Sequence, residues 1–102
     1  MEDKILRKLF LGFMHIHILH HARQKPFYGL WMIEELQEHG YLISAGTLYP
    51  MLRDMEQGGL LDVDSVIVGG KVRKYYAITA KGEKVLLQAS EKCRELFKEI
   101  SR

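Results

Sequence analysis

The stretch that decides the fold is Ser44-Ala45-Gly46-Thr47-Leu48-Tyr49-Pro50-Met51-Leu52-Arg53-Asp54-Met55-Glu56. Its large apolar residues recur at steps of three and four, the spacing of one buried helical face: Leu48, Met51, Leu52 and Met55. Ser44 stands at the N-cap position, where its hydroxyl is expected to accept a hydrogen bond from the first turn. The stretch therefore predicts a helix with one apolar face and one open face.

The open face begins with small and hydrogen-bonding side chains. A helical N-terminus of this composition suits insertion into the major groove of DNA, where base edges and phosphates offer hydrogen-bond partners. We therefore predict four DNA-binding residues on this helix: Ser44, Thr47, Tyr49 and Arg53. Thr47 and Tyr49 are expected near the bases and Arg53 at a phosphate. For Tyr49, packing of the ring against the hairpin described below is the alternative.

Two helices are predicted before this stretch. Residues 4–22 form a helix that is apolar on more than one side, and such a helix is buried from more than one side. Pro26 cannot continue that helix. Residues 28–38 form a short amphipathic helix that Gly40 terminates. Residues 28–57 therefore read as a helix-turn-helix, with a glycine-containing turn and a capped second helix.

A β-hairpin is predicted after this stretch, over residues 61–78. Its first strand is rich in β-branched residues, and Gly69-Gly70 gives a tight turn that tolerates positive φ. A hairpin in this position is the wing of a winged helix. Three basic residues of the returning strand are predicted to bind DNA: Lys71, Arg73 and Lys74. The alternative is a solvated edge, since lysines commonly protect exposed strands.

The last predicted helix covers residues 79–101 and begins at Thr79, whose side chain is expected to cap it. It carries an apolar seam at intervals of three and four: Leu86, Ala89, Cys93, Leu96 and Ile100. The first helix offers a matching surface that includes Leu6 and Phe13. We predict that these seven residues form the interface of a homodimer.

Four histidines gather in the first helix: His15, His17, His20 and His21. His17 and His21 are four residues apart and could hold a metal on one helical face. No cysteine or carboxylate of the adjacent sequence completes a ligand set, so we predict structural histidines, no bound metal and no cofactor. A metal-sensing regulator that uses the cluster from His15 to His21 is the alternative.

Composition limits the class of protein. The 102 residues are expected to form a single domain, residues 1–102, with a formal net charge of +2. The single Cys93 excludes an internal disulfide and fits a reducing cytoplasm. The apolar run from Leu9 to Leu19 is too short to span a bilayer, so no membrane association is expected. The sequence shows no activated nucleophile, paired carboxylates or phosphate-binding loop, so we do not expect an enzyme.

The order of motifs resembles the PadR family of bacterial transcriptional regulators over about residues 5–90. That family shows a Gly-Thr-Leu-Tyr-Pro helix, a Gly-Leu-Leu exit, a glycine-bearing hairpin and an Arg-Lys-Tyr-Tyr-x-x-Thr-x-Lys-Gly segment. Here these motifs start at Gly46, Gly59 and Arg73. The resemblance implies an α+β fold that is mostly α, a winged helix-turn-helix with added N- and C-terminal helices. At His21 the family usually carries an apolar residue, so this chain departs from it there.

By this resemblance the protein is a sequence-specific DNA-binding transcriptional regulator, a repressor that a small-molecule effector releases from its double-stranded DNA operator. Charge leaves a competing hypothesis open. Residues 34–64 carry seven acids and one basic residue, Arg53, so the helix expected to enter the groove lies in an acidic segment. A winged helix that binds proteins instead of DNA is therefore the alternative function.

Overall fold

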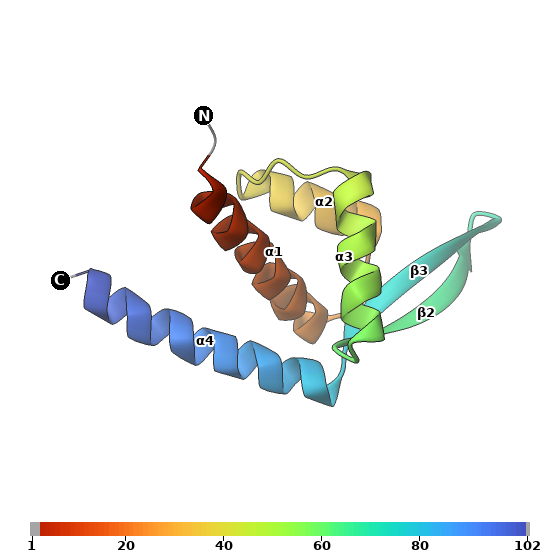
Figure 1. The fold of residues 1–102 in the computed structure, drawn as a ribbon. Helices are drawn as coiled ribbons and strands as arrows, with labels where there is room; N and C mark the ends of the chain where they lie inside the picture. The colour runs from red at the N-terminus through yellow and green to blue at the C-terminus, as the bar shows by residue number, and fades with distance from the viewer. Residues whose placement is uncertain (1–2, 102) are drawn as a thin grey trace.

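The computed structural model describes residues 3–101 as four helices and one antiparallel sheet (Figure 1). In chain order the elements are α1 (Lys4–Gln24), β1 (Phe27–Tyr28), α2 (Gly29–Glu38), α3 (Ala45–Gln57), β2 (Leu61–Val68), β3 (Lys71–Ile78) and α4 (Ala80–Ile100). The expected α+β class with a majority of helix is confirmed. Within the described residues, no helix is both long and apolar enough to cross a membrane.

The sheet has the strand order β1-β3-β2, and β1 was not predicted. Residue 28 was expected to open a helix, but it lies in a two-residue strand in which Phe27 pairs with Tyr76 and Tyr28 with Tyr75. A strand of two residues is too short to show alternation. It forms because β3 offers a free edge on the side away from β2, which is a tertiary effect. The first helix also runs two residues further than predicted, to Gln24.

The two predicted N-caps have different outcomes. The Thr79 side chain accepts a hydrogen bond from the Gly82 amide at 2.9 Å and thereby caps α4, as predicted. Ser44 occupies the N-cap position of α3, but its side chain makes no capping hydrogen bond. Its hydroxyl is instead exposed to solvent, while its carbonyl accepts the amides of Thr47 and Leu48 at 3.1 and 2.9 Å. The predicted cap is therefore absent.

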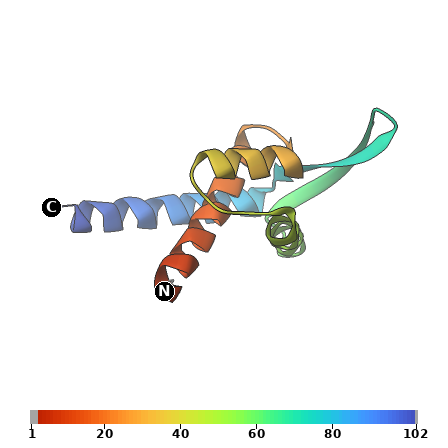
Figure 2. The same ribbon diagram turned by 90° about the horizontal axis from the view of Figure 1, so that it is seen from above.

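The core lies where α1, α2, α3 and the base of the sheet meet. The predicted apolar face of α3 is confirmed, since Leu48 and Leu52 have no exposed surface and Met51 and Met55 are buried. Other elements contribute the remaining fully buried side chains: Ile18, Met32, Leu36 and Leu61. The wing and the far end of α4 project from this core in opposite directions (Figure 2).

Gly82 marks the tightest approach between α4 and the sheet. A Cβ there would lie inside contact distance of the Leu60 carbonyl oxygen and 2.8 Å from Cγ1 of Ile78. The Leu60 carbonyl cannot easily move, because it accepts the Thr79 amide at 3.1 Å. Sequence analysis did not single out this requirement for glycine.

We expect Gly82→Ala to lower the free energy of unfolding by about 1–3 kcal/mol, the usual cost of overpacking. This loss should exceed the gain in helix propensity, which is about 0.5–1 kcal/mol. Urea unfolding followed by circular dichroism measures the change. The matched control is Gly46→Ala, where the nearest atom to an added Cβ is Ser44 Oγ at 3.7 Å. Equal stability of the two variants would contradict the packing argument.

Candidate nucleic-acid interface

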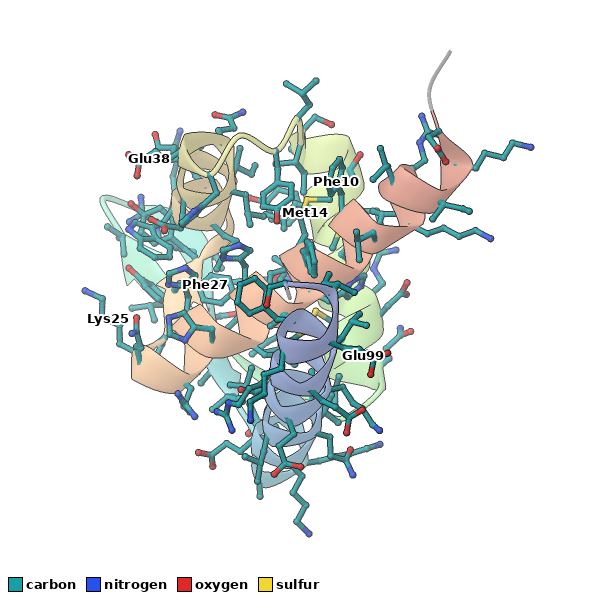
Figure 3. The ribbon with its side chains drawn as sticks, turned by 90° about the vertical axis from the view of Figure 1, so that its left-hand side faces the viewer. Phe10, Met14, Lys25, Phe27, Glu38 and Glu99 are labelled. Atoms are coloured by element: carbon teal, nitrogen blue, oxygen red, sulfur yellow. The ribbon has the colours of Figure 1, made fainter. Side chains whose placement is uncertain are left out.

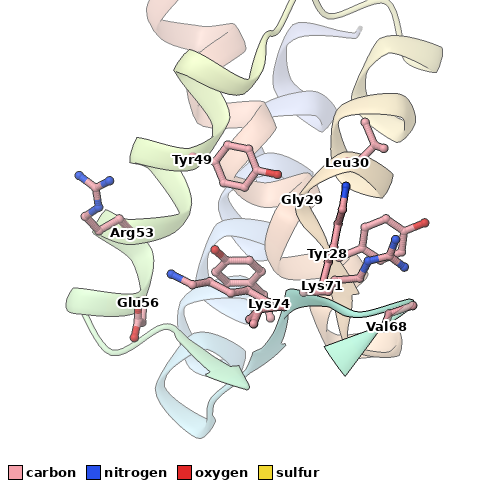
Figure 4. A pocket seen from close by; sticks show the side chains of 12 residues that line it. Tyr28, Gly29, Leu30, Tyr49, Arg53, Glu56, Val68, Lys71 and Lys74 are labelled. Atoms are coloured by element: carbon pink, nitrogen blue, oxygen red, sulfur yellow. The ribbon is translucent and has the colours of Figure 1, made fainter. Parts of the chain in front are cut away.

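A concave surface lies between α3 and the wing, with a cavity of about 690 Å³ (Figure 4). Tyr49 and Arg53 line it from α3, while Lys71 and Lys74 line it from the wing. The start of α2 closes it on a third side through Gly29. The fold thus brings the two predicted DNA-binding regions, which are separated in sequence, to one surface.

The open face predicted for α3 is present. Ser44, Thr47 and Arg53 are exposed, and all three lie on the side of the helix away from the core. In addition, the exposed Gly46 leaves the first turn without bulk, so another molecule can approach the backbone closely. This part of the helix therefore offers hydroxyl and guanidinium donors to another molecule.

Tyr49 has a neighbour that was not expected. Its ring packs on Gly29 at the start of α2: a Cβ on that glycine would lie 2.5 Å from the tyrosine hydroxyl oxygen and 2.6 Å from a ring carbon. The ring therefore contacts α2, while Tyr49 stays 42% exposed on the concave surface that it shares with the wing. Sequence reasoning missed Gly29, whose only signal was its place beside Tyr28 at the helix start.

Tyr76 forms the floor of the concave surface. Burial raises the pKa of its hydroxyl above the ordinary value of 10.0, and the nearby Tyr49 and Glu56 raise it further, while Arg53 lowers it. The hydroxyl is therefore neutral at physiological pH. It adds a polar group to the surface without adding the negative charge that would repel a phosphate.

The three basic residues of the wing are held differently. Lys71 and Lys74 are exposed, whereas Arg73 is half-buried with its guanidinium 4.0 Å from the centre of the Tyr28 ring. Such a cation–π contact fixes the position of the charge. Alternation along β3 places Lys74 on the same face as the buried Tyr76. All three basic residues line the concave surface. Tyr28 is a second residue that sequence reasoning missed.

The residues predicted for dimerisation fall into two groups. Leu86 is buried in the protein's own core and Ala89 is half-buried. Near the start of α4 the apolar seam packs against α1 of the same chain. Further along α4 none of the described residues covers the seam. Phe13 is half-buried as well, and the other four residues are exposed: Leu6, Cys93, Leu96 and Ile100. Figure 3 looks along α4 and shows side chains spreading from it on all sides.

The fold and this surface define a class of protein. A helix-turn-helix whose second helix has an open face, followed by a basic two-stranded wing, is a winged-helix protein of the DNA-binding type. Residues 18–88 match the family described as the transcriptional regulator PadR-like family. The chain belongs to this family, as its motifs predicted. The family consists of transcriptional regulators and not of enzymes.

Individual relatives agree with this assignment. The chain is 40% identical over 85 residues to the transcriptional regulator Rv3488 of Mycobacterium tuberculosis, covering 83% of this chain and 79% of that protein. A PadR family transcriptional regulator from Eggerthella lenta has a TM-score of 0.83 at 33% identity, over 95% of this chain and 86% of that one. A PadR-like transcription factor from Bacteroides fragilis has a TM-score of 0.82 at 29% identity, over 97% of both chains.

Proposed function

We propose that the protein is a cytoplasmic repressor of transcription that binds a specific double-stranded DNA operator as a homodimer. A small-molecule effector releases it from this operator. The observation that carries the proposal is the shared concave surface of α3 and the wing (Figure 4). Side chains of α3 would read base edges, and the wing lysines would contact phosphates. DNA is favoured over a protein partner because the basic residues of the wing lie on the same surface as the open face of α3.

The proposed homodimer rests on apolar surface that the monomer leaves uncovered. Leu96, Phe97 and Ile100 of α4 are 58%, 67% and 71% exposed, and Ile5 of α1 is 76% exposed. Leu6, Leu9 and Phe10 extend this surface along α1. Large exposed apolar side chains gathered in this way mark interaction sites in soluble proteins. A second copy can cover it symmetrically, and a dimer would present two α3 helices to two half-sites.

The proposed effector would act between α1 and α4. A groove of about 460 Å³ separates these helices and is lined by Phe13, Ile16, Leu87 and Cys93, among others. A molecule held there would change the angle between the helices that form the dimer. The distance between the two α3 helices of the dimer would then change. The fit of the dimer to the two half-sites of the operator would change as a result.

The second candidate function, a winged helix that binds proteins, is favoured by the acidic residues near α3. Glu56 lies in the concave surface itself. Selection of bound sequences from random duplex DNA decides between the two functions. Recovery of one recurring palindromic sequence supports operator binding. Absence of duplex binding above background at about 50 mM salt would favour the protein-binding function.

The wing lysines provide a quantitative prediction. We expect Lys71→Ala and Lys74→Ala each to weaken binding to operator and to scrambled duplex alike, because phosphate contacts carry no sequence information. Each variant should reduce the slope of log affinity against log salt by about 1 per protomer, hence about 2 per dimer. Salt titrations with labelled duplexes measure the slope. Lys84→Ala, an exposed lysine of α4, should leave the slope unchanged, and an equal change there would remove the wing from the interface.

A further inference from the structure

Three histidines from two elements meet on the side of the molecule away from the wing. His17 and His21 lie on α1, and His39 is the C-cap residue of α2. One possible ligand nitrogen from each lies within 4.8 Å of the other two. Among residues 3–101, this is the one group of three or more histidine, cysteine or acidic side chains arranged closely enough to share a metal ion.

The cluster is compact enough to contract to a tetrahedral zinc site. His17 and His21 are spaced i and i+4, so their rings lie parallel on one helical face, 6.1 Å apart at an interplanar angle of 11°. The His39 ring lies 4.5 Å from the His17 ring. Zinc–nitrogen bonds of about 2.0–2.1 Å place ligand atoms roughly 3.3–3.4 Å apart, so small side-chain rotations would close the site.

A carboxylate supplies a fourth group. Oε2 of Glu35 lies 3.0 Å from Nε2 of His39 and 3.4 Å from Nε2 of His21. The first separation is a hydrogen bond that His39 donates, and the second is close to that between neighbouring ligands of a tetrahedral zinc ion. The Glu35 side chain is only 21% exposed, so the residues around it restrict its position. Its negative charge would also offset part of the charge of a divalent ion.

His21 has a ligand nitrogen without a hydrogen-bond partner. Nε2 of His21 is buried and makes no hydrogen bond in the described structure. Burial lowers the pKa of His17 below its ordinary value of 6.5, and His39, His21 and His20 lower it further against the opposing effect of Glu35. Burial likewise lowers the pKa of His21, against an opposing effect of Glu35. Neutral imidazole is the form that binds metals.

We propose that His17, His21 and His39, with Glu35 as the fourth ligand, bind a divalent transition metal ion of the Zn²⁺ type. Imidazole and carboxylate ligands suit zinc and its neighbours and do not suit Mg²⁺, which prefers oxygen ligands throughout. The remaining two histidines of α1 are outside the site. His15 has its Nδ1 2.7 Å from the Leu11 carbonyl oxygen, and His20 contacts only the edge of the cluster through the His21 ring.

This inference departs from the sequence-based expectation of structural histidines and no metal. That expectation followed from the lack of a third ligand near His17 and His21 in the sequence. The fold supplies Glu35 and His39 from α2, and neither belongs to the histidine-rich segment that drew attention. The proposed site therefore shares His17 and His21 with the metal-sensing alternative and takes its other two ligands from α2.

The position of the site gives metal binding a consequence. The ion would join α1, which is proposed to form the dimer, to the end of α2, from which the chain leads into α3. The Tyr41 ring packs edge-on against His17 at 5.5 Å within that connection. An effect on operator affinity rests on the proposed function, whereas binding of the ion does not, so the two can fail separately.

Metal binding is tested with tag-free protein from which metal has been removed by a chelator. Zn²⁺ is titrated against a chromophoric chelator, and Co²⁺ is added separately to record the visible absorption of a tetrahedral site. We expect one ion per chain and no response to Mg²⁺. His17→Ala and His39→Ala should weaken Zn²⁺ binding at least about 100-fold, and Glu35→Gln by about 10–100-fold. His20→Ala is the matched control and should bind as the wild type does.

Circular dichroism shows whether each variant folds. His39 is exposed, so His39→Ala in particular is expected to retain the fold. Failure of the wild type to bind stoichiometric Zn²⁺, or equal binding by a folded His39→Ala variant, would overturn the proposal. Operator affinity is then measured with and without Zn²⁺. Metal binding without operator binding would leave the site in place and reject the proposed DNA-binding function.

Discussion

Leu96→Glu is expected to turn the proposed dimer into a monomer and to weaken operator binding by at least about 100-fold. Leu96 is 58% exposed on the part of α4 that its own chain does not cover. A dimer would bury it beside its symmetry mate, where two carboxylates could not be solvated or paired. A monomer meets only one half-site and loses the gain of simultaneous binding, which is typically 10²–10⁴-fold.

Sedimentation velocity at micromolar concentration measures the change of state. Gln88→Glu is the matched control, because it adds the same charge at an exposed polar position of α4. This control should remain dimeric and bind the operator as the wild type does. Circular dichroism of the Leu96 variant distinguishes dissociation from loss of folding. A wild-type protein that stays monomeric at high concentration would remove the main support for the dimer.

Thr47→Ala is expected to weaken operator binding by about 1–3 kcal/mol, the cost of a lost base contact, while binding to scrambled duplex changes far less. Thr47 is exposed on the first turn of α3 and faces away from the core. Its neighbour Gly46 allows the backbone to approach a base edge. The ratio of the affinities for operator and scrambled duplex, measured at one salt concentration, is therefore the informative quantity.

The control for this experiment is Gln57→Ala, at the opposite end of the same helix. It is exposed and should leave both affinities unchanged. Comparison with the wing variants separates the two contributions to binding, since Lys71→Ala should weaken both duplexes equally. If Thr47→Ala also weakens both duplexes equally, α3 contributes phosphate contacts only, and the residues that read the bases must lie elsewhere.

Local signals in the sequence predicted most of the fold. The apolar spacing of α3, the glycines at 58–59 and 69–70 and the β-branched residues of β2 each describe a single element, and the structure has these elements where they were expected. The cap at Thr79 was equally local. Ser44 shows the limit of such signals, because a residue at an N-cap position can direct its hydroxyl to solvent instead of the helix.

The features that could not be predicted depend on contacts between distant residues. Phe27 and Tyr28 form a strand only because the edge of β3 is beside them. Tyr49 lies against Gly29, twenty residues earlier in the chain, where the absence of a side chain accommodates its ring. Leu86 follows the same periodicity as Leu96, yet the first is covered by the protein itself and the second is not. Periodicity identifies an apolar face but not what covers it.

The short β1 strand gives the molecule a mechanical property. Only Lys25 and Pro26 separate the end of α1 from β1, and β1 is hydrogen-bonded to β3. Two residues span at most about 7 Å when fully extended, so this connection has almost no slack. A rotation of α1 would therefore be expected to shift β1, and with it Arg73, whose guanidinium lies over Tyr28. The position of the wing is in this way coupled to the position of α1, the helix proposed to contact the second protomer.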